Sequence, residues 1–204
     1  MTRNKLSKAS KEFMDHIRSL FQTNPQVADT YMSKLAKLAN LDFGKGSALL
    51  RGRLKEELFA ECVLANIPRC QRIQDAVVDY SFRGTGISHK EIGWTGRGEG
   101  LAMSWSKGGH HRSPFGVPLF IVNTSEHLSS KKGLPFGFYI FPKGIQNTIS
   151  LSSNNKTDQL VPRSVVLQEM QNSLNFPGGD YFIPFAYNHS GGRDVQFSVL
   201  KSIQ

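Results

Sequence analysis

The N-terminal part of the chain repeats apolar positions with the period of an α-helix. Phe13 and Ile17 belong to a set of apolar residues at three- and four-residue spacing, which predicts one apolar stripe on a first helix. Asn24 followed by Pro25 is a typical N-cap and first-turn combination, so we expect a second helix to begin there. The pattern predicts a helical N-terminal region, which we assign to residues 1–44.

A third helix is predicted over residues 47–66. Its apolar positions at four-residue spacing, which predict a buried stripe, are Leu50, Leu54, Leu58 and Cys62. Glu57 and Glu61 are one turn apart and flank that stripe. Each of them is either a surface carboxylate that pairs with a nearby cation or a carboxylate that reaches a site on the sheet.

Residues 75–107 read as short strands joined by glycine turns, and the rest of the chain is arranged around this stretch. Strand-forming residues such as Tyr80 and Ile87 lie on both sides of the turn sequence Arg-Gly-Thr-Gly at 83–86. This arrangement predicts a β-hairpin, followed by a third strand that ends near residue 106.

The hairpin brings together side chains that can do chemistry. Side chains alternate across a strand, so Asp75 and Asp79 share one face of the first strand, while Ser88 and Lys90 share one face of the second. A two-residue turn that begins at Arg83 would place Asp79 opposite Ser88, and a turn that begins one residue later would place it opposite Lys90. Either register leaves an Asp beside a Lys, with a Ser nearby.

The second half of the chain contains further strands, two of which are expected to be buried on both faces. The apolar runs at 117–122 and 136–141 are typical of such strands. The remaining predicted elements are a strand at 101–106, a loop or weak hairpin at 143–159, a short helix at 165–172, and closing strands at 181–186 and 195–200. The order of elements predicts an α/β fold with a mixed central sheet flanked by helices, in a single domain of residues 1–204.

The charge balance favours a polyanionic partner. The chain has 204 residues, with 25 Lys and Arg against 16 Asp and Glu, which gives a formal net charge of +9. An excess of cations suits nucleic acid, since each phosphate contact uses one. The sequence has no apolar run of membrane-spanning length and its N-terminus lacks the apolar core of a signal peptide, so we expect a cytoplasmic protein without a membrane partner.

Asp79 and Lys90 provide two of the groups that phosphodiester hydrolysis needs. Carboxylate oxygens hold a divalent cation such as Mg²⁺, and an ammonium group stabilises the charge that develops on the phosphate. Glu57 or Glu61 can add a second carboxylate. The sequence therefore contains a candidate hydrolytic site that uses a metal ion and a lysine.

Two other functions are open at this point. In the first, Asp79 and Lys90 form an ordinary cross-strand ion pair in a basic protein that binds DNA or RNA without cutting it. In the second, the chain is an enzyme that acts on a small phosphorylated substrate. The Gly-Lys-Gly-Ser at 44–47 lacks the spacing and the preceding strand of a phosphate-binding loop, so nothing in the sequence supports this second alternative.

The helix with its glutamates, the strand with Asp79, the glycine turn and the strand that carries Lys90 together resemble the PD-(D/E)xK nuclease superfamily. Within it, the chain is most similar to small type II restriction endonucleases, over roughly residues 47–125. The resemblance implies a Mg²⁺-dependent enzyme that cuts both strands of DNA at a short sequence through a metal-activated water. It also implies a homodimer, since two-fold symmetry matches a palindromic site.

The resemblance also implies roles for individual residues. Asp79 would bind the metal, with Asp75 as the next choice, and Lys90 would be the catalytic lysine. Ser88 is the departure from the motif, because it stands two residues before the lysine, where the family has an Asp or Glu. A serine is a weaker ligand for Mg²⁺ than a carboxylate, so the metal needs another oxygen.

The helix glutamates are the candidates for that missing ligand. We assign Glu61 to the metal and to the catalytic set, and Glu57 to the catalytic set alone. Residues predicted to contact DNA are Arg97, Lys107, His110, His111 and Arg112. Of these, Arg112 is the candidate for reading the edge of a guanine.

Overall fold

The structure is a computed structural model of the 204-residue chain. It describes residues 6–39, 48–73, 78–93, 103–106, 117–142, 150–151, 158–161, 163–176 and 178–185.

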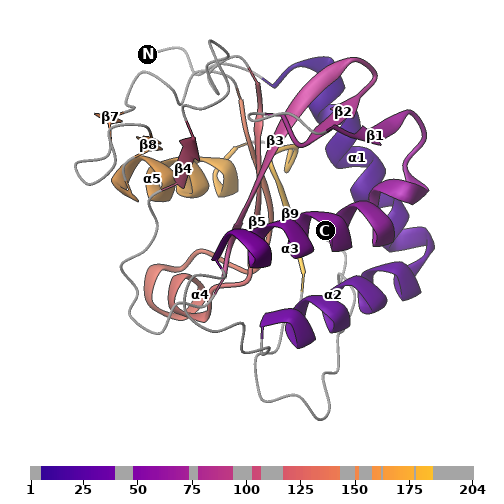
Figure 1. The fold of residues 1–204 in the computed structure, drawn as a ribbon, viewed down its shortest axis with the longest axis horizontal. Helices are drawn as coiled ribbons and strands as arrows, with labels where there is room; N and C mark the ends of the chain where they lie inside the picture. Colours follow the sequence, from indigo (N-terminus) through magenta and orange to yellow (C-terminus); the bar gives the residue numbers. More distant parts are fainter. Residues whose placement is uncertain are drawn as a thin grey trace.

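A six-stranded sheet forms the centre of the fold (Figure 1). In spatial order its strands are β1 (Cys70–Arg72), β2 (Tyr80–Phe82), β3 (Thr85–Ile92), β5 (Leu119–Asn123), β6 (Gly137–Phe141) and β9 (Phe182–Pro184). Strands β3 and β5 are parallel, whereas every other pair of neighbours is antiparallel. The sheet is therefore mixed, as the sequence predicts.

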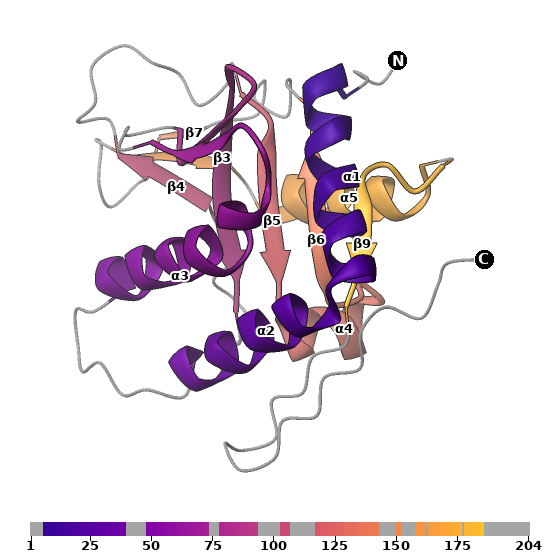
Figure 2. The same ribbon diagram turned by 90° about the vertical axis from the view of Figure 1, so that its right-hand side faces the viewer.

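Helices cover both faces of this sheet. Figure 2 shows α1 (Lys8–Thr23), α2 (Pro25–Ala39) and α3 (Ala48–Cys62) in front of the strands, with α4 (Glu126–Lys132) and α5 (Arg163–Leu174) behind them. The 3₁₀ turn η1 (Leu64–Asn66) follows α3. The predicted fold class, α/β with a mixed central sheet and a helical N-terminal region, is confirmed. None of the described helices is long and apolar enough to cross a membrane.

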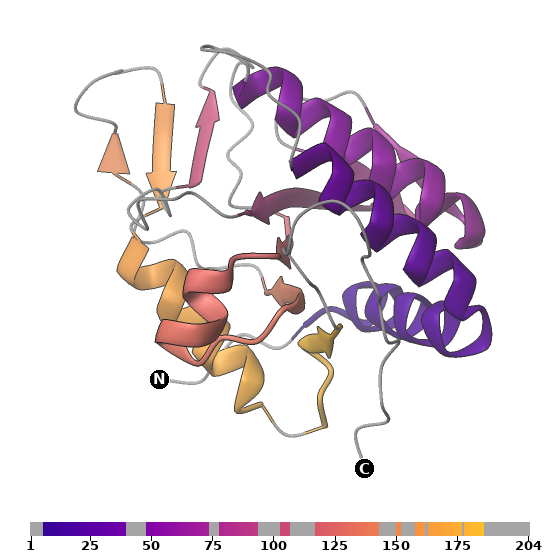
Figure 3. The same ribbon diagram turned by 90° about the horizontal axis from the view of Figure 1, so that it is seen from below.

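A second, smaller sheet lies beside α5 (Figure 3). It consists of β4 (Met103–Ser106), β8 (Asp158–Val161) and β7 (Ser150–Leu151), and all of its pairings are antiparallel. The predicted third strand thus exists, but it pairs with a strand from the predicted weak hairpin at 143–159. The predicted strand at 195–200 lies outside the described residues.

Apolar side chains fill the space on both faces of the central sheet. Under α1, α2 and α3, the rings of Phe13, Phe59 and Phe138 are fully buried. On the opposite face, Tyr139 packs with Met170 of α5 in a second cluster. All five positions of β5 are buried, which explains why its sequence is a continuous apolar run.

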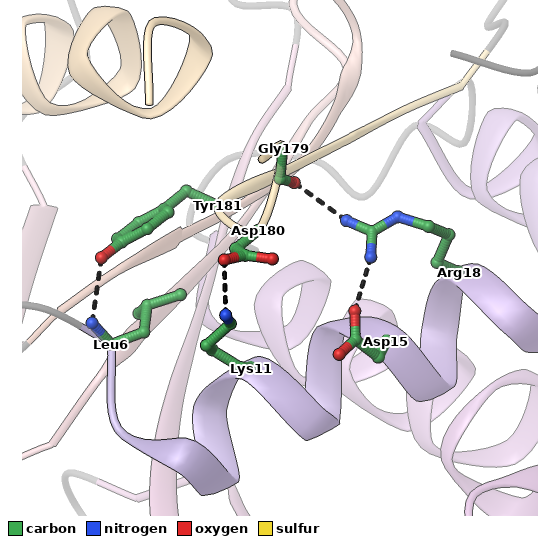
Figure 4. Close-up of polar contacts among 7 residues, drawn as sticks. All are labelled: Leu6, Lys11, Asp15, Arg18, Gly179, Asp180 and Tyr181. Atoms are coloured by element: carbon green, nitrogen blue, oxygen red, sulfur yellow. Dashed lines mark hydrogen bonds and ion pairs between the residues drawn. The ribbon is translucent and has the colours of Figure 1, made fainter. Parts of the chain in front are cut away.

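The N-terminal helix α1 belongs to this core and is tied to the loop before β9 (Figure 4). The Phe13 ring lies 5.4 Å from that of Phe120, centroid to centroid. Lys11 Nζ lies 2.7 Å from a carboxylate oxygen of Asp180, and Arg18 donates to the Gly179 carbonyl at 2.9 Å. The backbone position of β9 is therefore coupled to the N-terminal helix.

The predicted buried stripe of α3 is wrong by one position. Phe59 and Val63 are fully buried, whereas Leu54 and Leu58 are half-buried. Phe59 takes this place because it contacts five other aromatic rings of the core, those of Tyr31, Tyr80, His89, Phe120 and Phe138. The helix is thus rotated relative to the prediction.

Two short elements, β1 and α4, were not predicted from the sequence. The sequence contains the end signals of α4: Ser125 caps its first turn by accepting from the Leu128 amide, and Gly133 ends it in the left-handed conformation at φ 61°. Strand β1 has three residues that are partly or fully exposed, so it carries no apolar pattern.

Candidate functional site

A tight turn sets the register of the β2–β3 hairpin. Phe82 pairs with Thr85, so the turn consists of Arg83 and Gly84. Both turn residues have positive φ, 50° and 78°. A two-residue turn of this kind matches the twist of the strands that it joins, and glycine adopts it without strain.

This register places Asp79 opposite Ser88, which is the first of the two alternatives that the sequence allows. The last pair of the ladder is Tyr80 with Ile87, and Asp79 follows it directly. Asp79 Oδ2 accepts a hydrogen bond from Ser88 Oγ at 3.3 Å and another from the His89 amide at 2.5 Å. Burial raises the pKa of Asp79, and the positive charge of Lys90 and these two hydrogen bonds oppose that rise.

Helix α3, which passes over β3 in Figure 2, adds a second carboxylate, Glu56. The pKa of Glu56 is raised to about 6, chiefly by burial and also by the negative charge of Asp79, while Lys90 and Arg72 act in the opposite direction. Glu56 is therefore within electrostatic reach of both Asp79 and Lys90. The sequence analysis did not select this residue.

The rotation of α3 explains why Glu56, and not its neighbour, lies there. Successive residues of an α-helix are separated by about 100° around the axis. Glu56 is therefore about 60° from the buried Phe59, whereas Glu57 is about 160° from it. A stripe centred on Phe59 turns Glu56 toward the edge of the buried face and Glu57 away from it.

The two glutamates selected from the sequence lie on the outer side of α3. Glu57 accepts from Arg72 at 3.4 Å, and the side chains of both residues are more than 30% exposed. Glu61 is exposed. Asp79 and Ser88 are thus in direct contact, and Asp79 interacts electrostatically with Glu56 and Lys90, whereas Glu57 pairs with Arg72 and Glu61 is exposed.

His89, between Ser88 and Lys90, faces the core instead of the site. Its ring is buried, and its Nδ1 lies 2.5 Å from the Tyr80 hydroxyl. Burial lowers the pKa of His89 to about 3, so the ring is neutral at physiological pH. The histidine thus anchors β3 to the aromatic core, and its backbone amide holds Asp79.

The remaining predicted site residues cannot be placed by this structure. Asp75, Arg97, Lys107, His110, His111 and Arg112 lie outside the described residues. Their predicted roles in metal or DNA binding stay predictions.

The donor set at the hairpin suits a hard divalent cation. Among the described residues, no group of three or more His, Cys, Asp or Glu is placed to hold a metal ion. Mg²⁺ needs fewer protein ligands than that, since it keeps several waters and binds through one or two carboxylates and substrate phosphates. Asp79 and Glu56 are two partly buried carboxylates of this kind, and a cation would offset the burial and the repulsion by Asp79 that raise the pKa of Glu56.

Comparisons with known proteins found a likeness in structure and no match in sequence. No family model matches the sequence, and no curated protein matches it either. Among solved structures, the chain is similar to one described as "Restriction endonuclease in complex with substrate DNA". The sequence identity is 16%, the match covers 78% of this chain and 86% of that chain, and the TM-score is 0.48.

Proposed function

We propose that this chain is a Mg²⁺-dependent endodeoxyribonuclease that cuts both strands of DNA at a short sequence, as type II restriction endonucleases do. The observation that supports the proposal most is Asp79 at the end of the β2–β3 ladder, held by Ser88 and the His89 amide and in electrostatic interaction with Glu56 and Lys90. Two carboxylates beside a lysine are the groups that hydrolysis of a phosphodiester by a metal-activated water requires.

Each residue has a separate role in this proposal. Asp79 and Glu56 hold the cation, and Ser88 keeps Asp79 in place through its hydrogen bond. A divalent cation bound there would lower the pKa of a water and neutralise part of the charge on the scissile phosphate. Lys90 orients the attacking water or stabilises the charge that develops on the phosphate.

Glu56 replaces the acid that the resembled motif has at the position of Ser88. Ser88 is 1% exposed and its hydroxyl donates to Asp79, and a hydroxyl is a weaker ligand for Mg²⁺ than a carboxylate. Glu56 lies on α3 instead of β3, but it interacts electrostatically with the same carboxylate, that of Asp79. The second carboxylate of the site is thus supplied by α3 instead of β3.

Double-stranded DNA is the proposed substrate, and a homodimer is the proposed assembly. The net charge of +9 suits a polyanion. Cutting both strands at one place requires one active site for each strand, and a two-fold dimer provides that arrangement for a palindromic sequence.

One observation favours a second candidate, a basic nucleic-acid-binding protein without catalysis. Asp79 already accepts two hydrogen bonds from its own hairpin, so the structure holds it without a metal ion. Incubation of supercoiled plasmid with the protein, in Mg²⁺ and in EDTA, separates the two candidates. The nuclease linearises plasmid in Mg²⁺ only, whereas the binding protein retards DNA on a gel and leaves it intact under both conditions.

A further inference from the structure

A buried ion pair links the two elements that carry the proposed site. Lys55 Nζ lies 2.6 Å from Glu91 Oε1, and their side chains are only 12% and 7% exposed. Lys55 directly precedes Glu56 on α3, and Glu91 directly follows Lys90 on β3. Each partner is therefore the sequence neighbour of a proposed site residue. Because side chains alternate faces along a strand, Glu91 points to the opposite face of β3 from Lys90.

The surroundings of this ion pair leave it little freedom. Thr124 donates a hydrogen bond to the same Glu91 oxygen at 3.4 Å. A Cβ atom at Gly93 would lie 3.3 Å from Lys55 Nζ, so a larger residue there would press on the ammonium group. The second carboxylate oxygen of Glu91 is buried and has no hydrogen-bond partner within the described part of the chain. Its charge is therefore balanced chiefly by Lys55.

A buried ion pair is a directional contact, in contrast to the apolar packing around it. The free energy of apolar contacts is proportional to the buried area and has no preferred direction, so such contacts tolerate rotation of a helix. Two desolvated charges, in contrast, compensate each other only at close range and in good geometry. Rotation of α3 by one residue, about 100°, would separate Lys55 from Glu91. The same rotation would carry Glu56 away from Asp79.

We propose that Lys55 and Glu91 are positioning residues that fix the rotation of α3 on β3, and with it the distance of Glu56 from Asp79 and Lys90. This inference rests on the function proposed above. Residues that orient metal ligands typically change metal affinity 10- to 100-fold when they are replaced. We therefore expect the loss of this ion pair to weaken metal binding through Glu56.

The test is a mutant cycle on the full chain, with Mn²⁺ binding measured by electron paramagnetic resonance. Lys55→Met with Glu91→Met removes both charges at similar volume, which keeps the fold while it removes the directional contact. Glu56→Gln is introduced alone and together with that double variant. The control is Lys11→Met with Asp180→Met, which removes an ion pair on α1 away from the site.

The cycle has distinct outcomes. The inference predicts that Lys55→Met/Glu91→Met weakens Mn²⁺ affinity about tenfold or more, that the control does not, and that Lys55→Met/Glu91→Met adds no further loss when it is combined with Glu56→Gln. Wild-type affinity in Lys55→Met/Glu91→Met, or losses that add fully to those of Glu56→Gln, would overturn it. If the wild-type chain binds no Mn²⁺, or if Glu56→Gln leaves its affinity unchanged, the proposed metal site itself fails.

A second variant keeps the test decisive if the methionine variant does not fold. Lys55→Leu with Glu91→Leu also removes both charges and the directional contact, with branched apolar side chains in place of methionine. Folding of each variant is checked by its thermal unfolding transition. The same comparison with Glu56→Gln then applies, and an affinity equal to wild type would again contradict the positioning role.

Discussion

Ser88 and Asp79 face each other across the β2–β3 hairpin, with Ser88 Oγ 3.3 Å from Asp79 Oδ2. Ser88 is 1% exposed and occupies the place where the resembled nuclease motif has an acid. A hydroxyl can satisfy a partly buried carboxylate, whereas a second carboxylate would repel it unless a cation lay between them. The residue at this position therefore determines how stable the hairpin is in the absence of a metal ion.

Ser88→Asp tests that relationship. In the absence of divalent ions, we expect the variant to have a free energy of unfolding lower by about 2 kcal/mol, because two like charges meet where water is scarce. Mg²⁺ should restore more stability to the variant than to wild type, since it binds the added carboxylate in the folded state. Thermal unfolding with and without Mg²⁺ measures both effects. Ser81→Asp on the same hairpin is the control, and an equal Mg²⁺ response in the two variants would contradict the proposal.

Glu56→Gln tests which glutamate of α3 serves the site. We expect its DNA cleavage rate at limiting Mg²⁺ to fall more than about 100-fold, because the change removes a ligand and not merely a residue that orients one. Glu57→Gln and Glu61→Gln are matched controls on the same helix and should cleave at nearly the wild-type rate. A larger loss in either control than in Glu56→Gln would show that the structure places the wrong carboxylate at the metal.

The raised pKa of Glu56 predicts that Glu56→Gln, which lowers activity, increases the free energy of unfolding. Its pKa of about 6 lies above the ordinary 4.5, so between these values the folded state binds more protons than the unfolded state. The free energy of unfolding therefore falls as pH rises through this window. At pH 7, Glu56→Gln should be more stable than wild type by on the order of 1 kcal/mol, a value reduced for the partial exposure of this residue. Urea unfolding at pH 4 and pH 7 checks this, and equal differences at both pH values would argue against it.

The corrected face of α3 predicts unequal costs in the core. Phe59→Ala should lower the free energy of unfolding by about 3–5 kcal/mol, because the ring is fully buried among other aromatic rings. Leu58→Ala should cost clearly less, since Leu58 is half-buried. Chemical denaturation of the two variants measures the difference. A larger loss for Leu58→Ala would support the stripe predicted from sequence.

Much of the fold follows from local sequence patterns. Strands β5 and β6 are continuous apolar runs because the sheet covers them on both faces, and α1 and α2 show regular apolar spacing. The hairpin was predictable as well, down to two alternative registers. The structure has the register in which Arg83 and Gly84 form the turn.

The rotation of α3 was harder to predict, and the choice of carboxylate depends on it. Leu54 and Leu58 form one apolar row on this helix, and Phe59, with Val63 directly after the helix end, forms another beside it. The aromatic cluster selects the second row, and those rings come from distant parts of the chain. Because the sequence allows either row to be buried, it does not determine which glutamate of α3 is turned toward the sheet.

The strand pairing in the smaller sheet also could not be predicted from local sequence. The residues of β4 form a strand as predicted, but their partner β8 begins about fifty residues later. A strand that pairs across such a distance has no local signal for its partner, so the sequence assigns it to the nearest sheet.

The most direct test of the account is the digestion of a long, fully sequenced DNA in Mg²⁺ and in EDTA. Wild type is compared with Lys90→Ala and with Lys131→Ala, which removes an exposed lysine on α4. The account predicts discrete Mg²⁺-dependent fragments from wild type and Lys131→Ala, and intact DNA from Lys90→Ala, which still retards DNA on a gel. DNA that is retarded but never cut by wild type under any divalent ion would contradict the nuclease, and unchanged cleavage by Lys90→Ala would contradict the role of that lysine.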